Sequence, residues 1–351
     1  MTDSNPNIPD TARTPLIGLT LEGLRAVAAE CGMPRFAAGQ MAAWLYTKKV
    51  TDIEAMTDLS TKARARLAAG WTVGREEPLE VAVSADGTKK YVFAGVEGRN
   101  VEAVMIPDKD RATLCVSCQA GCRMNCAFCM TGRGGFNGQL SPAAIMNQIL
   151  GVEESDDLTN IVFMGMGEPT DNLQAVLDVI EILTADWGFA WSPKRITVST
   201  IGNLAGLRRL LEETKVHIAV SVHSPFSQER EEIMPVEKAW PIADVMSLLR
   251  GYDFSGQRRL SVEYTLWQGK NDDSRHAHAL ARLLKGTDAR VNLIRYHRIP
   301  GFDRQSPQAE AMERFRDTLN SLGVTATIRA SRGEDIMAAC GMLAGRKKEP
   351  K

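Results

Sequence analysis

The chain has 351 residues, of which 44% are hydrophobic, and its 42 Lys and Arg residues against 43 Asp and Glu residues give a formal net charge of −1 at pH 7. A chain of this length can bury an ample core without disulfide bonds, which excludes a small disulfide-stapled scaffold. The near-zero charge provides no overall field that would attract nucleic acid, so any RNA partner must be met by local basic patches.

The beginning of the chain is polar. Residues 1–16 are rich in Pro and Asn and lack a periodic apolar pattern, which predicts a disordered leader. No signal peptide opens the sequence, and apolar runs such as residues 41–46 are far shorter than the roughly 20 residues that cross a bilayer. We therefore expect a cytoplasmic protein without a membrane partner.

Two small units are predicted before the main domain. In residues 17–70 apolar side chains recur at helical spacing, which predicts a small helical module. In residues 71–110 short alternating runs flank the turn signal Asp86-Gly87, which predicts an antiparallel β extension.

Basic side chains in the helical module and in a tail of residues 346–351 are candidate phosphate contacts, although such runs are more often solvated surface. They are Lys62, Arg64, Arg66, Arg346, Lys347 and Lys348.

The main domain is predicted over residues 111–345, where apolar β-type runs alternate with helical stretches. The six expected strands are residues 113–117, 160–164, 195–200, 216–222, 260–266 and 290–296. The six expected helices are near residues 141–152, 171–184, 203–213, 240–250, 274–285 and 307–321. Strands that alternate with helices indicate right-handed βαβ units and a parallel sheet, so the fold class is α/β. Six such units predict a partial (β/α)6 barrel with its reactive face at the carboxyl ends of the strands.

Three of the seven cysteines follow the first predicted strand with the spacing Cys122-x3-Cys126-x2-Cys129. Three thiolates at this spacing can hold three corners of a [4Fe-4S] cluster and leave the fourth iron open. This spacing resembles the radical SAM superfamily, whose open iron binds S-adenosylmethionine (SAM) and reduces its sulfonium to release a radical. The alternative is a structural zinc site that Cys118 or Cys115 would complete.

Polar and glycine residues at the following strand ends fit the same cofactor. Gly167 and Glu168 lie in Met164-Gly165-Met166-Gly167-Glu168-Pro169, where glycine lets the backbone approach the methionyl amino group of SAM. Ser199, and Ser221-Val222-His223 at the end of the fourth strand, can bind its carboxylate and ribose. Each of these signals is common in turns and caps, but together they predict one SAM site at the reactive face.

Several motifs together resemble the RlmN/Cfr family of RNA-adenosine methyltransferases, with a similarity that runs from about residue 19 to residue 345. The motifs are Cys115-Val116-Ser117-Cys118-Gln119-Ala120-Gly121-Cys122, the cluster motif, Gly165-Met166-Gly167-Glu168-Pro169, Ser221-Val222-His223 and Ala338-Ala339-Cys340-Gly341. The stretch of residues 36–46 resembles the family's helical module, to which a part in RNA binding is attributed.

The resemblance implies a mechanism that consumes two SAM molecules per turnover. Cys340 would accept a methyl group from the first SAM. The second, cleaved at the cluster, would yield the radical that abstracts hydrogen from that methyl group. After the carbon adds to the adenine ring, Cys115 would attack Cys340 and resolve the adduct through a disulfide. Glu102 matches the family's base that removes the ring proton, although a lone Glu on a strand is otherwise most often solvated.

Two positions depart from the family pattern. Many members have serine where this chain has Cys118, and His297 stands where the family has an asparagine that contacts SAM. An imidazole can still donate one hydrogen bond there, but its charge varies with pH. Neither Cys118 nor Cys31 has an assigned task.

The resemblance is stronger to RlmN-like than to Cfr-like members. It implies methylation of C2 of adenosine 2503 in 23S rRNA and of adenosine 37 in tRNA, by a monomer that takes electrons from a donor such as flavodoxin. The alternative is a Cfr-like enzyme that methylates C8 of the same rRNA adenosine. The cluster and both distant cysteines would serve either reaction.

Overall fold

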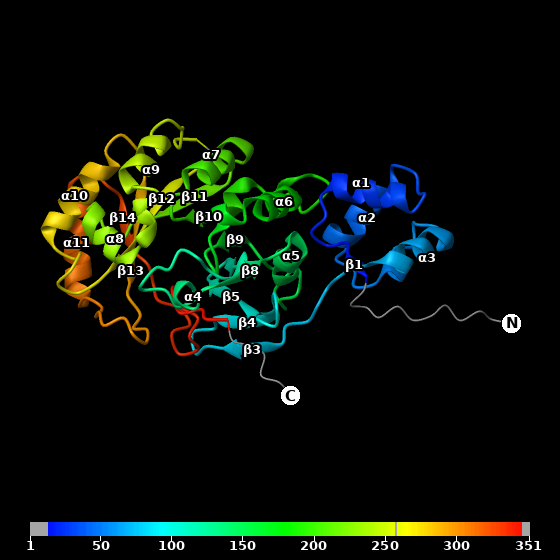
Figure 1. The fold of residues 1–351 in the computed structure, drawn as a ribbon, viewed down its shortest axis with the longest axis horizontal. Helices are drawn as coiled ribbons and strands as arrows, with labels where there is room; N and C mark the ends of the chain where they lie inside the picture. The colour runs from blue at the N-terminus through cyan, green and yellow to red at the C-terminus, as the bar shows by residue number, and fades with distance from the viewer. Residues whose placement is uncertain (1–12, 257, 346–351) are drawn as a thin grey trace.

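The computed structural model describes residues 13–256 and 258–345 and is built around one ten-stranded sheet (Figure 1). Its seven parallel strands are β6 (Arg111–Cys115), β9 (Asn160–Phe163), β10 (Ile196–Thr200), β11 (His217–Ser221), β12 (Leu260–Leu266), β13 (Arg290–Arg295) and β14 (Ala326–Ile328). They lie side by side in chain order from β6 to β14. Three antiparallel strands, β5 (Asn100–Asp108), β4 (Lys89–Ala94) and β3 (Glu80–Val83), continue the sheet beyond β6. The α/β fold with a partial barrel is thereby confirmed.

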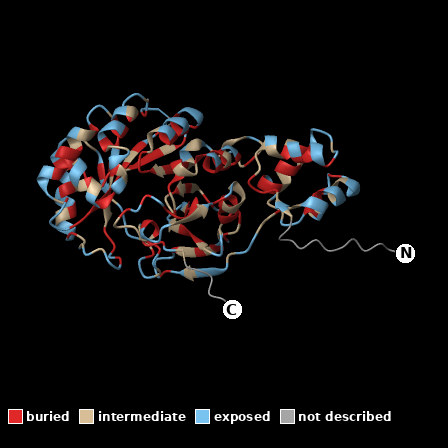
Figure 2. Cartoon of the chain, viewed as in Figure 1, coloured by how far each residue is buried: buried red, intermediate tan, exposed pale blue. Residues whose placement is uncertain are grey.

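Helices alternate with the parallel strands and cover the outer face of the curved sheet. They are α5 (Pro142–Leu150), α6 (Leu173–Thr184), α7 (Leu204–Glu213), α8 (Ser227–Ile233), α9 (Ile242–Leu249), α10 (Ser274–Leu284) and α11 (Ala309–Ser321). Their buried sides face the sheet and their exposed sides face solvent, as Figure 2 shows. This division follows from apolar side chains at helical spacing.

Local side-chain caps explain where several of these helices begin. The hydroxyl of Ser141 accepts a hydrogen bond of 3.2 Å from the backbone N–H of Ala144, and Pro142 occupies the first turn of α5. The carboxylate of Asp273 accepts one of 2.9 Å from the N–H of His276 in α10. Such caps satisfy backbone donors that have no partner inside the helix.

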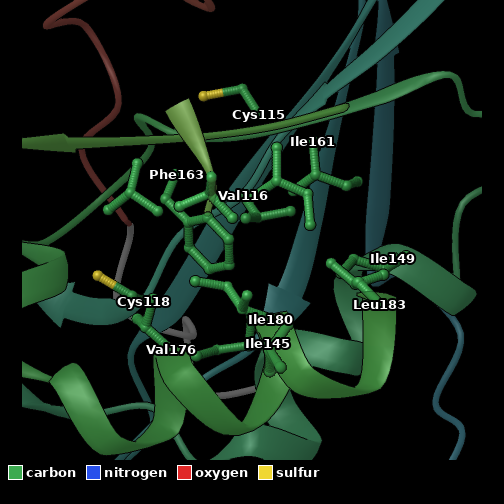
Figure 3. Close-up of a cluster of buried hydrophobic side chains, with 14 of the residues drawn as sticks. Cys115, Val116, Cys118, Ile145, Ile149, Ile161, Phe163, Val176, Ile180 and Leu183 are labelled. Atoms are coloured by element: carbon green, nitrogen blue, oxygen red, sulfur yellow. The ribbon is translucent and has the colours of Figure 1, made fainter. Parts of the chain in front are cut away.

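Strand alternation divides the residues of β6 between two environments. The side chain of Ile161 in β9 points to the layer of α5 and α6, where Ile180 is among the buried side chains (Figure 3). Leu114 pairs with Ile161 and therefore lies on the same face of the sheet. Cys115 pairs with Val162 and lies on the opposite face of the strand. The thiol of Cys115 therefore faces the inside of the partial barrel.

The first part of the described chain forms a separate group of short helices beside the barrel, at the right of Figure 1. It contains α1 (Leu21–Glu30), α2 (Ala37–Ala42) with a π-helical continuation (Ala43–Thr47), a 3₁₀ turn (Ile53–Ala55) and α3 (Thr61–Gly70). Side-chain contacts join this group to the barrel. Nζ of Lys49 forms an ion pair with a carboxylate oxygen of Asp156 at 2.6 Å, and the ring of Tyr46 packs on that of Trp187 with centroids 5.9 Å apart.

Three sequence expectations need correction. The predicted leader of residues 1–16 is too long, because Thr14–Pro15 (β1) pairs with Trp71–Thr72 (β2) and Leu16 is fully buried. Residues 1–12 lie outside the described part. The helical spacing expected throughout residues 17–70 holds only in part, because the chain over residues 48–60 forms a single 3₁₀ turn, Ile53–Ala55. A seventh parallel strand, β14, was missed because three residues carry too little periodicity.

Candidate active site

A single cavity lies at the carboxyl ends of the parallel strands and encloses about 980 Å³, its open mouth included. It collects most of the side chains that the sequence singles out. Those that line it are Cys122, Cys126, Cys129, Gly167, Glu168, Ser199, Ser221, His223, His297 and Cys340. Residues from four strand ends, the cysteine loop and the C-terminal segment thus share one space.

Three predicted site residues lie outside the wall of this cavity. Val222 is fully buried. Its backbone N–H donates a hydrogen bond to the backbone carbonyl of Glu263 in β12, and its own carbonyl accepts one from the side chain of Arg230. Cys115 lies on the inner face of β6, where burial and, to a smaller extent, the nearby Cys340 raise the pKa of its thiol to about 12. Glu102 is buried on β5 beneath the C-terminal segment.

Glu102 contacts two groups there. One carboxylate oxygen, Oε2, accepts a hydrogen bond of 3.1 Å from the backbone N–H of Ala344, and the other lies 3.9 Å from Nζ of Lys90. Its carbonyl accepts from the hydroxyl of Ser117 at 2.6 Å, and that hydroxyl accepts from the N–H of Met166 in turn. The backbone of Glu102 is therefore linked to the glycine turn after β9.

The cysteine loop presents its thiols on one side of the cavity. Cys122 and Cys126 are buried, and Cys129 is half-buried at the start of α4 (Met130–Arg133). Burial raises the pKa of Cys122 to about 12 and the pKa of Cys126 well above its usual range. Buried thiolates of this kind need a positive partner in place of water, as a metal centre would provide.

Gly167 and Glu168 form a tight turn after β9. Gly167 has φ of +103°, and a Cβ atom on it would lie 2.9 Å from the backbone nitrogen of Gln119, so only glycine fits without movement. The carboxylate of Glu168 accepts four hydrogen bonds, from the N–H and hydroxyl of Thr170, the hydroxyl of Thr200 and the N–H of Ile201. Burial raises the pKa of Glu168 even so.

His223 has one ring nitrogen committed to the backbone. Its Nδ1 accepts a hydrogen bond of 3.0 Å from the N–H of Thr265, and its ring meets that of Phe128 edge-on at 4.7 Å between centroids. Burial lowers the pKa of His223 to about 3, so the ring is neutral near pH 7 and carries its proton on Nε2. His297 is also buried, with Nδ1 3.4 Å from a carboxylate oxygen of Glu334.

A buried ion pair behind the cavity was not predicted from the sequence. Arg230 of α8 is fully buried and paired with Glu237. Its remaining N–H groups donate to the carbonyls of Ile201, Ser221 and Val222, which ties together the ends of β10 and β11. No pattern marks this Arg, because most arginines lie on the surface.

Other lining residues were missed as well. Glu263 and Arg329 line the cavity near Cys340 and lie 3.6 Å apart, and Asn292 donates a hydrogen bond of 2.7 Å to Glu263. Glu263 stands mid-strand in β12, and its inward orientation could have been suspected only from its place in an apolar run.

In the described ranges 13–256 and 258–345, no helix is long and apolar enough to span a membrane.

Comparison with known proteins identifies the family. The radical SAM superfamily profile matches residues 116–281, and the profile of the ribosomal RNA large subunit methyltransferase N-terminal domain matches residues 14–73. A protein of Porphyromonas gingivalis named as a dual-specificity RNA methyltransferase RlmN is 55% identical over 334 residues, which cover 95% of this chain and 98% of that protein. The chain belongs to the RlmN family.

Further members of the RlmN family and one solved structure agree. The "Dual-specificity RNA methyltransferase RlmN" of Marinobacter nauticus is 38% identical over 95% of this chain and 93% of its own. A crystal structure of a radical SAM methyltransferase from Sphaerobacter thermophilus has a TM-score of 0.88 and 38% identity, covering 94% of this chain and 99% of that one. This RlmN-family chain is accordingly a SAM-dependent RNA methyltransferase.

Membership of the radical SAM superfamily implies a [4Fe-4S] cluster and SAM, and the residues fit both. Neither Cys115 nor Cys118 is among the residues that line the cavity with the three loop cysteines. Within the described residues no three His, Cys, Asp or Glu side chains converge on a single-ion site. A cluster instead takes one thiolate at each of three separate irons.

All seven cysteines are free, and a Cys115–Cys340 disulfide stays a prediction.

Proposed function

We propose that this protein methylates C2 of adenosine 2503 in 23S rRNA and of adenosine 37 in tRNA, with the methyl group carried on Cys340. The observation that supports this most is that Cys340 and the three loop cysteines line the same cavity, although more than 200 positions separate them in the sequence. A thiol at this place can meet both SAM and a base that enters through the mouth.

Cys122, Cys126 and Cys129 would hold the cluster, which with SAM supplies a carbon radical that abstracts hydrogen. Gly167, Glu168, Ser199, Ser221, Val222, His223 and His297 would bind SAM. Within this set the neutral His223 offers its Nε2–H as a donor, and the turn at Gly167 exposes backbone groups. Val222 would take part only through its backbone, because its side chain is buried in the core.

Cys340 would first act as a nucleophile on a SAM methyl group. Its sulfur forms a bond to that carbon while the carbon–sulfonium bond breaks and its electron pair stays on the departing thioether. Although Cys340 is solvent-exposed, desolvation by the protein atoms around it raises the pKa of its thiol. The charge of Arg329 acts in the opposite direction and so favours the thiolate form that this step needs.

Cys115 and Glu102 would complete the reaction. After hydrogen abstraction, the S-bound carbon would add to C2 of the ring. The adduct would then lose one electron to the oxidised form of the donor protein, and Glu102 would take the C2 proton. The sulfur of Cys115 then attacks that of Cys340, so that an S–S bond forms while the S–C bond breaks towards the adenine. A proton completes the new methyl group, and external reductant restores the two thiols.

The RNA contacts, the electron donor and the cellular location belong to the proposal as well. We propose a monomeric cytoplasmic enzyme that receives electrons from a donor such as flavodoxin. Lys62 of α3 is exposed, whereas Arg64 is paired with Glu54 at 3.1 Å and Arg66 donates to the carbonyl of Cys31. Of the three side chains, Lys62 is therefore the most accessible candidate for a phosphate contact. Arg346, Lys347 and Lys348 lie outside the described residues.

Mass spectrometry of digested RNA from a strain that lacks the gene tests this function. We expect 2-methyladenosine to vanish from both 23S rRNA and tRNA and to return when the gene is restored. Persistence of 2-methyladenosine in both RNAs would contradict the proposal. Loss of 8-methyladenosine from 23S rRNA in its place would establish the Cfr-like alternative.

A further inference from the structure

The C-terminal segment that carries Cys340 is held by hydrogen bonds to distant parts of the chain. On its far side, the backbone carbonyl of Gly341 accepts from the N–H of Met130 at 2.8 Å, and that of Leu343 accepts from the hydroxyl of Thr131 at 2.6 Å. These bonds attach residues 341–343 to the short helix that follows the cysteine loop. We call residues 333–344 the strap.

The near side of the strap is attached to the turn between β3 and β4, at the edge of the sheet. The hydroxyl of Ser84 donates a hydrogen bond of 2.5 Å to one carboxylate oxygen of Asp335, and the N–H of Ala85 donates one of 3.1 Å to the other. In return, the carboxylate of Asp86 accepts a hydrogen bond of 3.0 Å from the N–H of Gly333. Turn and strap thus each supply a carboxylate to the other.

The turn is itself built to present these groups. The second oxygen of Asp86 accepts a hydrogen bond of 2.9 Å from the N–H of Thr88, and the N–H of Asp86 donates to the Ser84 hydroxyl at 3.3 Å. Ser84 and Thr88 are buried although they belong to an edge hairpin. The same carboxylate that closes the turn therefore also holds the strap.

The contact between turn and strap is close as well as polar. A Cβ atom on Gly333, which has φ of +61°, would lie 2.9 Å from the methyl carbon of Thr88 and 2.9 Å from Cβ of Ala338. The carbonyl of Gly333 accepts a hydrogen bond of 2.8 Å from the N–H of Ala338, which closes a tight loop directly before Cys340. Position and direction of Cys340 thus depend on where Gly333 is anchored.

From these contacts we propose that the β3–β4 turn, through Ser84, Asp86, Gly333 and Asp335, is the anchor that positions Cys340 in the cavity. None of these four residues lines the cavity, and we assign them as positioning residues that act through the strap. The consequence for methylation rests on the carrier role proposed above for Cys340. Cys340 lies five residues beyond Asp335 and directly before the attachment to α4. Loss of the contacts with the turn therefore weakens the near side of the strap, where a carboxylate oxygen of Glu334 still lies 3.4 Å from Nδ1 of His297.

The test is made with the full-length, cluster-loaded enzyme and the substitution Asp335→Ala. Asp110→Ala is the matched control, because Asp110 is an exposed aspartate in the β5–β6 turn of the same sheet. Gly333→Ala disturbs the second contact of the strap with the turn, that of Gly333 with Asp86 and Thr88, by steric overlap. For Asp335→Ala and Gly333→Ala we expect amide exchange in residues 336–344 to be about tenfold faster or more, since hydrogen bonds to charged groups are lost. Cys340 is already exposed to reagent, and its alkylation by iodoacetamide should accelerate to a smaller extent as the strap loosens.

In the same variants the turnover number for RNA methylation should fall about tenfold, while cluster absorbance and the dissociation constant of SAM stay at the values of Asp110→Ala. Alkylation and exchange rates equal to those of the control would overturn the anchor. Faster alkylation with unchanged methylation would support the anchor and count against Cys340 as the methyl carrier, so the two proposals fail separately.

Discussion

The backbone N–H of Thr265 donates a hydrogen bond of 3.0 Å to Nδ1 of His223. This bond fixes the ring tautomer, since a nitrogen that accepts cannot carry the proton. His223 is 4% exposed and is surrounded by the rings of Phe128 and Trp267, so protonation would place an unbalanced charge in an apolar site.

The first prediction concerns acid stability. Burial lowers the pKa of His223 to about 3, against about 6.5 in the unfolded chain, so the unfolded state binds more protons below pH 6.5. The free energy of unfolding therefore falls as the pH falls, by about 2 kcal/mol from this residue between pH 7.5 and pH 5.0. Urea unfolding at both pH values should show this loss in wild type and a smaller one in His223→Gln. An equal loss in both would contradict the assignment.

The second prediction concerns the buried pair of Arg230 and Glu237. Glu237→Gln leaves the buried guanidinium without its counterion, and we expect the free energy of unfolding to fall by about 3–5 kcal/mol. The control is Glu231→Gln, which breaks the exposed pair with Lys238 at 3.0 Å and should cost less than about 1 kcal/mol. Denaturant unfolding measures the loss of unfolding free energy in both variants. Similar losses in the two would show that other groups compensate the buried charge of Arg230.

The third prediction concerns the glycine turn. Gly167→Ala places a methyl group against Gln119 at a positive φ, so we expect SAM affinity to fall about tenfold or more. Gly39→Ala in α2 meets no atom within 4 Å and should keep SAM affinity, with unfolding free energy unchanged or raised by up to about 1 kcal/mol. Equilibrium binding of SAM measures both. Unaltered affinity in Gly167→Ala would mean that the turn lies outside the SAM site.

The fourth prediction separates the iron–sulfur cluster from a zinc site. Cys118 is buried away from the cavity wall, whereas Cys122 lines it. Cys118→Ala should therefore retain the iron and sulfide content of wild type after anaerobic reconstitution, and Cys122→Ala should lose most of it. One zinc and no iron in the wild-type protein, together with zinc loss in Cys118→Ala, would favour the closed zinc site.

The parallel sheet could be predicted because buried strands give apolar runs that alternate with amphipathic helices. The exception, β14, has only three residues, too few to show a period. The join between the antiparallel extension and the barrel, at Val104 and Cys115, depends on strand pairing that no local pattern encodes.

The candidate site, too, could be predicted from the sequence only in part. The three loop cysteines were found because their spacing is itself the signal. Arg230 and the anchor at Asp335 were not, since polar residues of these types usually lie in solvent. The role of Asp335, for example, depends on Ser84, which is 251 positions away and which only the folded chain brings close to it.

The carrier role of Cys340 is the central claim, and a single-turnover isotope experiment tests it most directly. Enzyme is first incubated with SAM that bears a deuterated methyl group, freed of small molecules, and then mixed with substrate RNA, reductant and unlabelled SAM. We expect a deuterated methyl group on the Cys340 peptide before RNA is added, and two deuterium atoms in the first methyl group on the RNA. An unlabelled first methyl group, or full methylation by Cys340→Ala, would contradict it.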